Sequence, residues 1–310
     1  MRIAFFGSDD FAVPSLRALA AAGHELGLVV TNPDRRRGRS SELLATPVKE
    51  LALELGAPVV QPEGRPGDEL ATRLREAGLE LGVVVAYGQF LTRAVRSAPG
   101  LGYSINLHGS LLPRWRGAAP VAAAIRAGDP VTGVSVQKVA RRMDGGPVLA
   151  RREEEVQPHD TRGALRERLS ELGAELLVEA VAAISAGEAR FEAQDEAQAT
   201  YAGLLSKSDG LLDLSRPAVE LERVVRACHP WPVAAVELGG ARLQVLKAAV
   251  ATGMTGAAPG TVVSVSDQGL WIETGHGALD LVEVRPTGKR AMSGAAYARG
   301  RRLATGEALR

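Results

Sequence analysis

Two polar side chains, Asn106 and His108, occur in a strand-like stretch at a spacing that could do chemistry. Residues two apart on a β-strand project to the same side, so these two would emerge together while Leu107 turns to the other face. An amide can donate a hydrogen bond to a developing oxyanion, and an imidazole can donate a second one or carry a proton. The pair is therefore a candidate catalytic site.

The sequence after this pair favours a functional interpretation over a structural histidine. Residues 109–113 are Gly-Ser-Leu-Leu-Pro, which predicts a turn directly after the strand. In an open parallel sheet, ligands bind at the carboxyl ends of the strands. We therefore expect a ligand beside this turn.

The elements that must position these residues alternate regularly in the first half of the chain. Apolar runs of strand length are separated by segments with Leu and Ala at helical spacing, which indicates a parallel sheet covered by helices on both faces. We therefore expect an α/β fold with a Rossmann-like, doubly wound parallel sheet. The expected strands are residues 3–6, 26–30, 58–61, 81–86 and 103–107, and the expected helices are residues 13–22, 47–55 and 68–77.

The middle of the chain should complete this first domain. A hairpin-like pair of strands at residues 131–139 and 146–152 precedes a long amphipathic helix at 161–186. The next stretch has no clear strand or helix period. We therefore expect a catalytic domain over residues 1–188 and a linker over 189–208.

The last third of the chain, residues 209–310, predicts a second domain of a different kind. A short helix at 218–229 is followed by short strands that Gly and Pro interrupt at regular spacing. This pattern is typical of a small β-barrel, which we expect to be OB-like. The expected strands are residues 234–238, 242–250, 260–265, 269–274 and 277–284.

Composition favours a globular cytoplasmic protein. The chain has 310 residues, of which 45% are hydrophobic and 24% charged, and this length favours two domains. A single cysteine, Cys228, can form no internal disulfide and offers no metal cluster, so we expect a metal-free protein in a reducing compartment. The start lacks a signal peptide's pattern, and no run approaches the ~20 apolar residues that span a bilayer.

Two further features exclude common alternatives. The formal net charge is +1, with 12 Lys and Arg against 10 Asp and Glu from Asp209 onward and 25 against 26 before it, so neither half is a generic polycation. Gly7 follows the first strand, but residues 8–11 are Ser-Asp-Asp-Phe, without the further glycines of a dinucleotide fingerprint. NAD binding is therefore disfavoured.

The segment around the Asn-His pair also resembles a known family. NLHGSLLPRWRGAAP at residues 106–120 resembles the signature of 10-formyltetrahydrofolate-dependent formyltransferases, and its PRWRGAAP part resembles the branch that acts on methionyl-tRNA. The similarity extends over nearly the whole chain. It includes FFGSDDFA at 5–12, NPDR at 32–35, TPVK at 46–49, VVVAYGQFL at 83–91, LSK at 205–207, HPWP at 229–232 and PTGKRAMS at 286–293.

The resemblance implies transfer of the formyl group of 10-formyltetrahydrofolate to the free amine of methionyl initiator tRNA. It also implies a third catalytic residue, Asp144, because the Met-Asp-Gly-Gly at 143–146 resembles the family's Leu-Asp-Thr-Gly. Gly145 replaces the usual Thr, which changes the hydrogen bonding of this loop. In this interpretation Asn106 donates to the oxyanion, and His108 donates a second hydrogen bond or protonates the departing folate nitrogen. Asp144 would orient the imidazole and accept the proton of the amine.

The resemblance further assigns residues to folate binding. It places the pteridine against residues 84–91 and the loop at 139–144, beside the turn that follows the Asn-His strand. Backbone groups there can bond a flat heterocycle while apolar side chains enclose it. The implied residues are Val84, Ala86, Tyr87, Gly88, Gln89, Leu91, Ser110, Leu111, Leu112, Pro113, Val139 and Met143.

For tRNA, the resemblance points to an Arg-rich loop at residues 34–41, where Arg39 matches the family's functional arginine. Arginine side chains can pair with phosphates or stack on exposed bases, and in the family this loop enters the acceptor end. The following Ser-Ser-Glu at 40–42 is less basic than the family's Gly-Lys-Lys. We expect a monomer that binds tRNA through Arg35, Arg36, Arg37, Arg39, Lys207, Arg285, Lys289 and Arg290.

Three other functions stay open at this point. A sugar-nucleotide formyltransferase would share the Asn-x-His strand, the Ser-Leu-Leu-Pro turn and a barrel-like C-terminal domain, but it would need no Arg-rich loop. A formyl-folate hydrolase would use the same three residues with water as the acceptor. A non-catalytic RNA-binding protein on an enzyme scaffold is disfavoured, because Asn106, His108 and Asp144 are all present.

Overall fold

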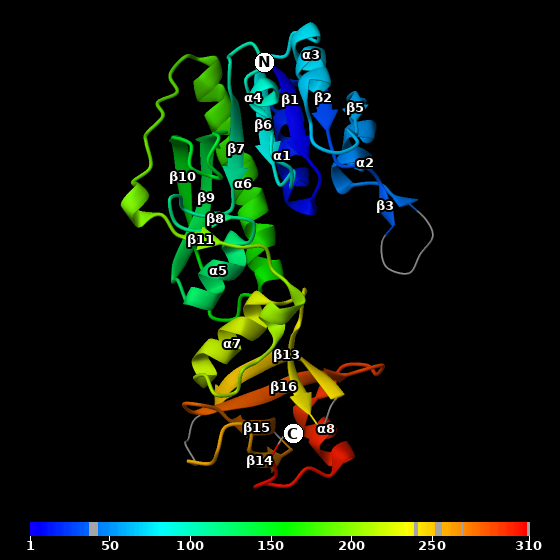
Figure 1. Ribbon diagram of the computed structural model, residues 1–310, viewed down its shortest axis with the longest axis vertical. Coiled ribbons are helices and arrows are strands. Elements are labelled where there is room, and N and C mark those ends of the chain that lie inside the picture. Colours follow the sequence, from blue (N-terminus) through cyan, green and yellow to red (C-terminus); the bar gives the residue numbers. More distant parts are fainter. Residues whose placement is uncertain (37–42, 239–240, 252–255, 268, 309–310) are drawn as a thin grey trace. The chain divides into compact units, whose positions relative to one another are not determined.

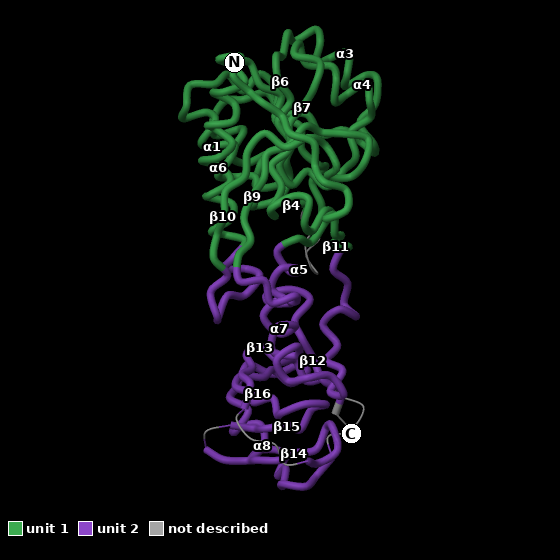
Figure 2. Tube along the Cα trace, turned by 90° about the vertical axis from the view of Figure 1, so that its left-hand side faces the viewer, with its two compact units in different colours: residues 1–120, 131–155, 166–203 green, residues 121–130, 156–165, 204–310 purple. Residues whose placement is uncertain are grey.

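The structure, a computed structural model, divides into two compact units (Figure 1, Figure 2). It describes residues 1–36, 43–238, 241–251, 256–267 and 269–308. Unit 1 comprises residues 1–120, 131–155 and 166–203, and unit 2 comprises residues 121–130, 156–165 and 204–310. None of the helices in these described ranges is long and apolar enough to cross a membrane.

A seven-stranded sheet forms the centre of unit 1, in the order β10-β9-β7-β6-β1-β2-β5. The five strands from β7 to β5 are parallel, while β9 runs antiparallel to β7 and β10 antiparallel to β9. The α/β class and the parallel sheet are thus confirmed, and the expected hairpin joins that sheet. The strands are β1 (Arg2–Gly7), β2 (Glu25–Val30), β5 (Val59–Val60), β6 (Leu81–Val85), β7 (Ser104–His108), β9 (Val131–Lys138) and β10 (Val148–Glu155).

Helices cover this sheet because its strands are apolar on both faces. Ala4 and Phe6 of β1 pack with residues of α3 and α4 in one buried cluster. On another strand, Leu107 points to α6, where a Cβ added at Gly173 would lie 2.7 Å from its side chain. The helices are α1 (Val13–Ala21), α2 (Pro47–Glu54), α3 (Asp68–Glu76), α4 (Arg93–Arg96), α5 (Pro120–Ala127) and α6 (Arg162–Ser185).

Local signals explain the start of helix α2 and the glycine at the end of strand β1. Helix α2 starts after Thr46, whose hydroxyl accepts a hydrogen bond from the Lys49 backbone N–H, and Pro47 occupies the first turn. Gly7 at the end of β1 has no room for a side chain, because an added Cβ would lie 2.8 Å from the Phe5 ring and 3.0 Å from the Val85 carbonyl oxygen. Gly7 therefore allows close packing.

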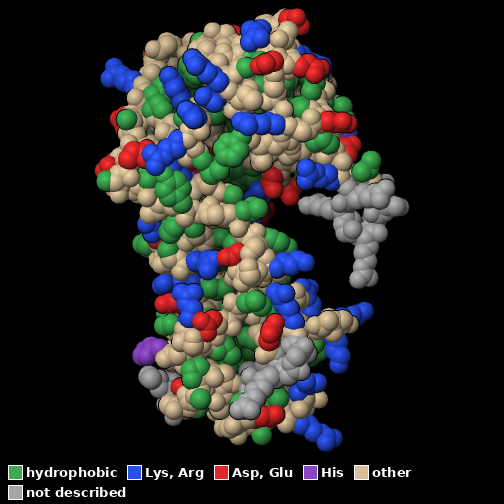
Figure 3. Space-filling model, viewed as in Figure 1, with side chains coloured by type: hydrophobic (Ala, Val, Ile, Leu, Met, Phe, Trp, Pro, Cys, Tyr) green, Lys and Arg blue, Asp and Glu red, His purple; other side chains and the backbone are tan. Residues whose placement is uncertain are grey.

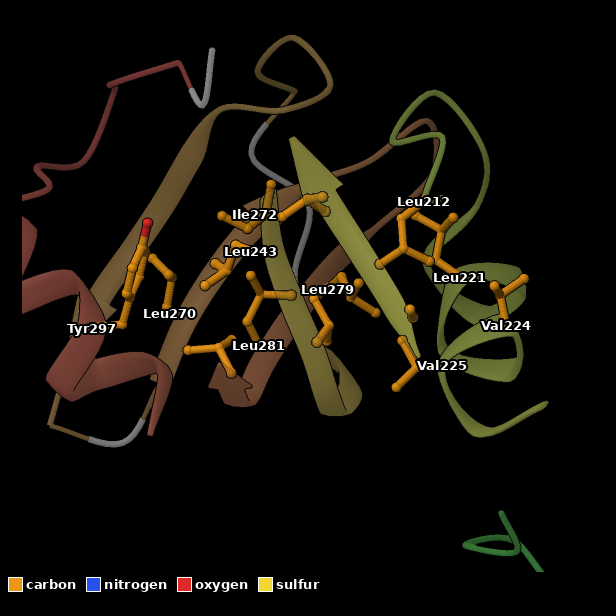
Figure 4. Close-up of a cluster of buried hydrophobic side chains, with 14 of the residues drawn as sticks. Leu212, Leu221, Val224, Val225, Leu243, Leu270, Ile272, Leu279, Leu281 and Tyr297 are labelled. Carbon is orange, nitrogen blue, oxygen red and sulfur yellow. The ribbon is translucent and has the colours of Figure 1, made fainter. Parts of the chain in front are cut away.

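An antiparallel sheet and two helices form most of unit 2. The sheet has the order β12-β13-β16-β15-β14, with β17 added beside β16. Figure 4 shows the core between this sheet and helices α7 and α8, with Leu221 and Val225 on one side and Tyr297 on the other. The elements are α7 (Ala218–Ala227), β12 (Ala234–Leu238), β13 (Ala241–Ala251), β14 (Val262–Ser266), β15 (Gly269–Glu273), β16 (Ala278–Pro286), β17 (Met292–Ser293) and α8 (Gly294–Arg301).

The segment expected to be a linker is ordered, and its residues 189–203 belong to unit 1 while residues 204–208 belong to unit 2. The Phe191 ring meets Tyr103 edge to face at 5.7 Å, and the ammonium of Lys138 lies 4.2 Å from both ring centroids. Strand β11 (Tyr201–Ala202) pairs in parallel with the two-residue strand β8 (Arg116–Gly117). The segment also contains the short 3₁₀ helices η2 (Glu196–Gln198) and η3 (Lys207–Gly210).

Candidate active site

Strand β7 brings the Asn-His pair to the carboxyl end of the parallel sheet. Asn106 lies beside Val84 of β6 and opposite Gln137 of β9, and His108 lies opposite Ser135. Leu107 faces helix α6, so the expected alternation of side chains holds. The two polar residues therefore share the face of the sheet opposite α6.

His108 is nearly buried, and its ring orientation is defined by a backbone contact. Its side chain is 7% exposed, and its Nε2 lies 2.9 Å from the carbonyl oxygen of Trp115. Because a carbonyl oxygen can only accept, Nε2 carries a hydrogen in this arrangement. The other nitrogen, Nδ1, lies 3.7 Å from Oδ2 of Asp144. The Nδ1 side of the ring therefore faces the carboxylate.

Asp144 is fixed by hydrogen bonds to both oxygens of its carboxylate. The Gly117 backbone N–H donates to Oδ2 at 2.8 Å, and the Gln137 side-chain amide donates to Oδ1 at 3.0 Å. The backbone of Asp144 has a φ of 47°, in the left-handed region that few residues other than Gly adopt. These contacts hold the carboxylate beside the imidazole, so the structure brings His108 and Asp144 together.

The Asn106 side chain is in a different situation. Among the described residues, none forms a hydrogen bond with its amide, which is only partly buried. Its neighbour across the strands, Gln137, is 2% exposed and fully engaged with the loop at residues 144–146. The Asn106 amide is therefore available as a donor to a ligand at this edge of the sheet.

Sequence reasoning missed the residues that fix this geometry. Gln137 occurs in strand β9, VTGVSVQK, which also contains Thr132, Ser135 and Lys138, so one more polar residue gave no reason to place it beside Asp144. Trp115 and Gly117 act through backbone groups, which leave no signal in residue type. The one available signal was a Gln at a position of β9 that the structure shows to be buried.

The turn after β7 is held by its own hydrogen bonds. The Ser110 hydroxyl donates to the carbonyl oxygen of Arg114 at 2.6 Å, and the Ser135 hydroxyl donates to the Ser110 carbonyl oxygen at 2.7 Å. The Leu112 N–H donates to Ser135 at 3.1 Å. These hydrogen bonds therefore fix the shape of the turn at the carboxyl end of β7.

The other residues expected at the folate lie on β6, on the loop that follows it and on the loop before β10. Ala86 and Gly88 have left-handed backbones, with φ of 45° and 78°. Tyr87 is buried against Phe6, its pKa is raised to about 12 by that burial, and its hydroxyl has no partner among the described residues. Val84 and Leu91 are buried, Val139 is partly buried, and Met143 is 44% exposed.

Asn32, just after the end of β2, supports the loop that follows β6. The side-chain amide of Asn32 donates to the Tyr87 carbonyl oxygen at 2.8 Å, and the Gln89 amide donates to the Asn32 side-chain oxygen at 2.5 Å. Gln61 donates to the Asn32 carbonyl oxygen at 2.8 Å. These amides give the loop a fixed shape.

Two of the expected tRNA-binding residues, Arg35 and Arg36, form strand β3, which pairs with β4 (Leu43–Leu44) as a short antiparallel ribbon (Figure 1). Arg37 and Arg39 lie outside the described residues. Asp34 anchors the base of the ribbon through Lys49 at 2.6 Å and Gln61 at 2.6 Å, and the hydrogen bond from Lys49 lowers the pKa of its carboxyl most.

The remaining expected tRNA-binding residues lie in unit 2. Lys207, Lys289 and Arg290 are exposed, while Arg285 is partly buried and its Nε donates to Gln244 at 2.7 Å. Figure 3 shows basic and acidic side chains interspersed over the face of this unit in view. Within the described residues, no cluster of His, Cys, Asp and Glu could hold a metal ion.

Comparison with known proteins identifies the family. Residues 1–181 match the model of the formyl transferase family, and residues 204–302 match that of the formyl transferase C-terminal domain. A methionyl-tRNA formyltransferase from Pseudomonas paraeruginosa is 44% identical over 100% of this chain and 99% of its own length.

Solved structures share the fold. The sugar 3N-formyl transferase WlaRD superposes with a TM-score of 0.67 at 15% identity, over 94% of this chain and 99% of its own. HypX from Aquifex aeolicus, in complex with tetrahydrofolic acid, superposes with a TM-score of 0.59 at 18% identity over 96% of this chain. This chain spans about half the length of HypX, 47% of it. From the family models and the full-length relative, we conclude that the chain belongs to the formyl transferase family.

Proposed function

We propose that this chain transfers the formyl group of 10-formyltetrahydrofolate to the amine of methionyl initiator tRNA. The observation that carries the proposal is the placement of Asn106, His108 and Asp144 at one strand end, in a chain that resembles a methionyl-tRNA formyltransferase along its whole length. The family match supplies formyl transfer, and the relative's name supplies the acceptor.

The arrangement suits direct attack of the amine on the formyl carbon. A bond forms between the methionyl nitrogen and this carbon, and the bond from the carbon to the folate nitrogen breaks. The Asn106 amide donates to the oxyanion that develops, where such donors contribute most to rate. The His108–Asp144 pair takes the proton that the amine loses and passes it to the departing folate nitrogen, so the protons balance and the pair returns to its starting state.

No covalent intermediate on the enzyme is needed. The Ser110 hydroxyl donates to the carbonyl oxygens of Arg114 and Trp115 and not to a side-chain base. The single cysteine, Cys228, is fully buried in unit 2, and burial raises the pKa of its thiol. Neither side chain is a suitable nucleophile, so direct transfer is favoured.

The folate site is proposed around the loop after β6. Ala86 and Gly88 have left-handed backbones, and Gln89 is held by Asn32, so this loop has a fixed, irregular backbone. Such backbone groups can read the edge of a flat heterocycle. The other proposed members are Val84, Tyr87, Leu91, Ser110, Leu111, Leu112, Pro113, Val139 and Met143.

The tRNA site is proposed to use both units, with catalysis in residues 1–188, a connection at 189–208 and tRNA placement in 209–310. The ribbon of β3 and β4 leads into the Arg-rich loop, and its base is fixed by the Asp34–Lys49 ion pair. Lys207, Arg285, Lys289 and Arg290 would add phosphate contacts. The single buried cysteine fits a reducing compartment, so we place the reaction in the cytoplasm. We also propose that the enzyme acts as a monomer.

The choice of acceptor can be tested directly. Formyl transfer from 10-formyltetrahydrofolate is measured in parallel with methionyl initiator tRNA, with a 4-amino sugar nucleotide and with no acceptor. We expect formylated methionyl-tRNA with the first and little release of tetrahydrofolate in the other two. Formylation of the sugar alone, or fast hydrolysis without acceptor, would exclude the proposed function.

The role of Asn106 leads to a second prediction. Asn106→Ala and the isosteric Asn106→Asp both lose the donor, so turnover should fall by roughly 10²-fold to 10³-fold, while the KM for folate changes little. Steady-state kinetics with methionyl initiator tRNA measure both constants. Near-normal turnover in both variants would remove Asn106 from the mechanism.

The proposed tRNA contacts of unit 2 predict a change in salt dependence. Changing Arg285, Lys289 and Arg290 together to Gln should raise the KM for tRNA and reduce the slope of log(kcat/KM) against log[salt] by about one per lost contact. The matched control neutralises Arg299 and Arg301 of helix α8 together with Arg302, which follows the end of that helix. If both triple variants keep the parent slope, the phosphate contacts lie elsewhere.

A further inference from the structure

Arg116 is a fully buried charge that lies next to the active site but outside the catalytic trio. Its side chain is 0% exposed, and its guanidinium donates to Glu196 through two bonds of 3.0 Å each. The same group donates to the side-chain oxygen of Gln194 from Nε at 3.1 Å and from Nη2 at 2.9 Å. Both partners belong to the segment that joins the two family domains, so this segment satisfies the buried charge.

These bonds orient the Gln194 amide. A guanidinium has donors only, so the Gln194 oxygen must face Arg116 and the Gln194 nitrogen must point away from it. That nitrogen donates to the carbonyl oxygen of Asp144 at 2.8 Å and to that of Gly146 at 2.6 Å. The amide therefore ties the buried arginine to the backbone of the catalytic loop.

The loop needs such a tie, because its own conformation is unfavourable. Asp144 has a left-handed backbone, a state that persists in a non-glycine residue only when its surroundings impose it. Arg142, at the other end of the loop, donates to the Tyr201 hydroxyl at 2.8 Å and pairs with Glu196 at 2.5 Å. The same segment thus holds the loop at two points.

The segment also fixes the backbone on the other side of the site. Thr200 accepts a hydrogen bond from the Trp115 N–H through its hydroxyl at 2.8 Å and one from the Arg116 N–H through its carbonyl oxygen at 2.8 Å. Gly117 permits this pairing, since an added Cβ would lie 2.4 Å from the Ala202 carbonyl oxygen. Trp115 in turn contacts His108, and Gly117 contacts Asp144.

We propose that Gln194 and Thr200 are positioning residues of the active site and set the distance between His108 and Asp144. Gln194 acts through the carbonyl oxygens of the catalytic loop, and Thr200 acts through the backbone of β8. This inference rests on the proposed function in one respect: formyl transfer is the activity that its test measures. Gln194 and Thr200 touch no reacting atom and act through other residues.

Gln194→Glu separates this role from simple support of Arg116. The new carboxylate can still accept from Arg116, but it places an oxygen where the amide donated to the Asp144 and Gly146 carbonyls. We expect the single-turnover rate of formyl transfer to fall about 10-fold to 100-fold, because displacements near 1 Å have such effects, with the KM for folate within about twofold. Gln198→Glu is the matched control, since Gln198 is exposed and bonds only Asp195 among the described residues.

Thr200→Val provides a second variant in case Gln194→Glu does not fold, as judged by its melting curve. It removes the hydroxyl that accepts from Trp115 at constant volume, and we expect a rate loss with an unchanged KM. Parent rates in folded Gln194→Glu and Thr200→Val would overturn the proposal, as would equal losses in Gln198→Glu. If the parent enzyme formylates another acceptor, the proposed function fails, but the ratio of variant to parent rates on that acceptor still tests the positioning role.

Discussion

The active arrangement depends on one constraint, the hold on the Asp144 carboxylate beside the His108 imidazole. Both carboxylate oxygens accept hydrogen bonds, from Gly117 and Gln137, and the left-handed backbone beneath them is imposed from outside the loop. In the proposed mechanism, a carboxylate fixed in this way stabilises the imidazole that has taken up a proton without itself moving, so little reorganisation opposes formyl transfer. Trp115, which bonds His108, and Gln194, which bonds the Asp144 carbonyl oxygen, also bear on this contact.

Two features of unit 1 position Asp144: the buried guanidinium of Arg116 and the backbone pairing of β8 with β11. Arg116 is the fully buried member of its ion pair, while the Glu196 side chain is 49% exposed, and hydrogen bonding to Arg116 lowers the pKa of that carboxyl. Burying a charge is costly unless its hydrogen bonds are satisfied, and Gln194 and Glu196 satisfy those of Arg116. The PRWRGAAP motif therefore has a structural explanation: consecutive residues contact His108, the joining segment and Asp144.

Much of the fold could be predicted from the sequence, because periodicity reports burial directly. The parallel strands, the long helix α6 (Arg162–Ser185) and the strands of unit 2 appear where the apolar patterns place them. The Asn-His pair was also found, since its spacing of two identifies one face of a strand. Partners that act through backbone groups or distant contacts, such as Trp115 and Gln194, were not found. The segment 189–208 was interpreted as a linker because its order comes from contacts with unit 1 and not from an internal period.

The most direct test of the account is a double-mutant cycle on the His108–Asp144 pair. Single-turnover formyl transfer to methionyl initiator tRNA is measured for the parent, His108→Ala, Asp144→Asn and the double variant. If the two side chains act as one unit, each single change should slow transfer by about 10²-fold to 10⁴-fold, and the double variant should be scarcely slower than the slower single one. Rate losses that multiply in the double variant would show that the two residues act independently, and this would contradict the account.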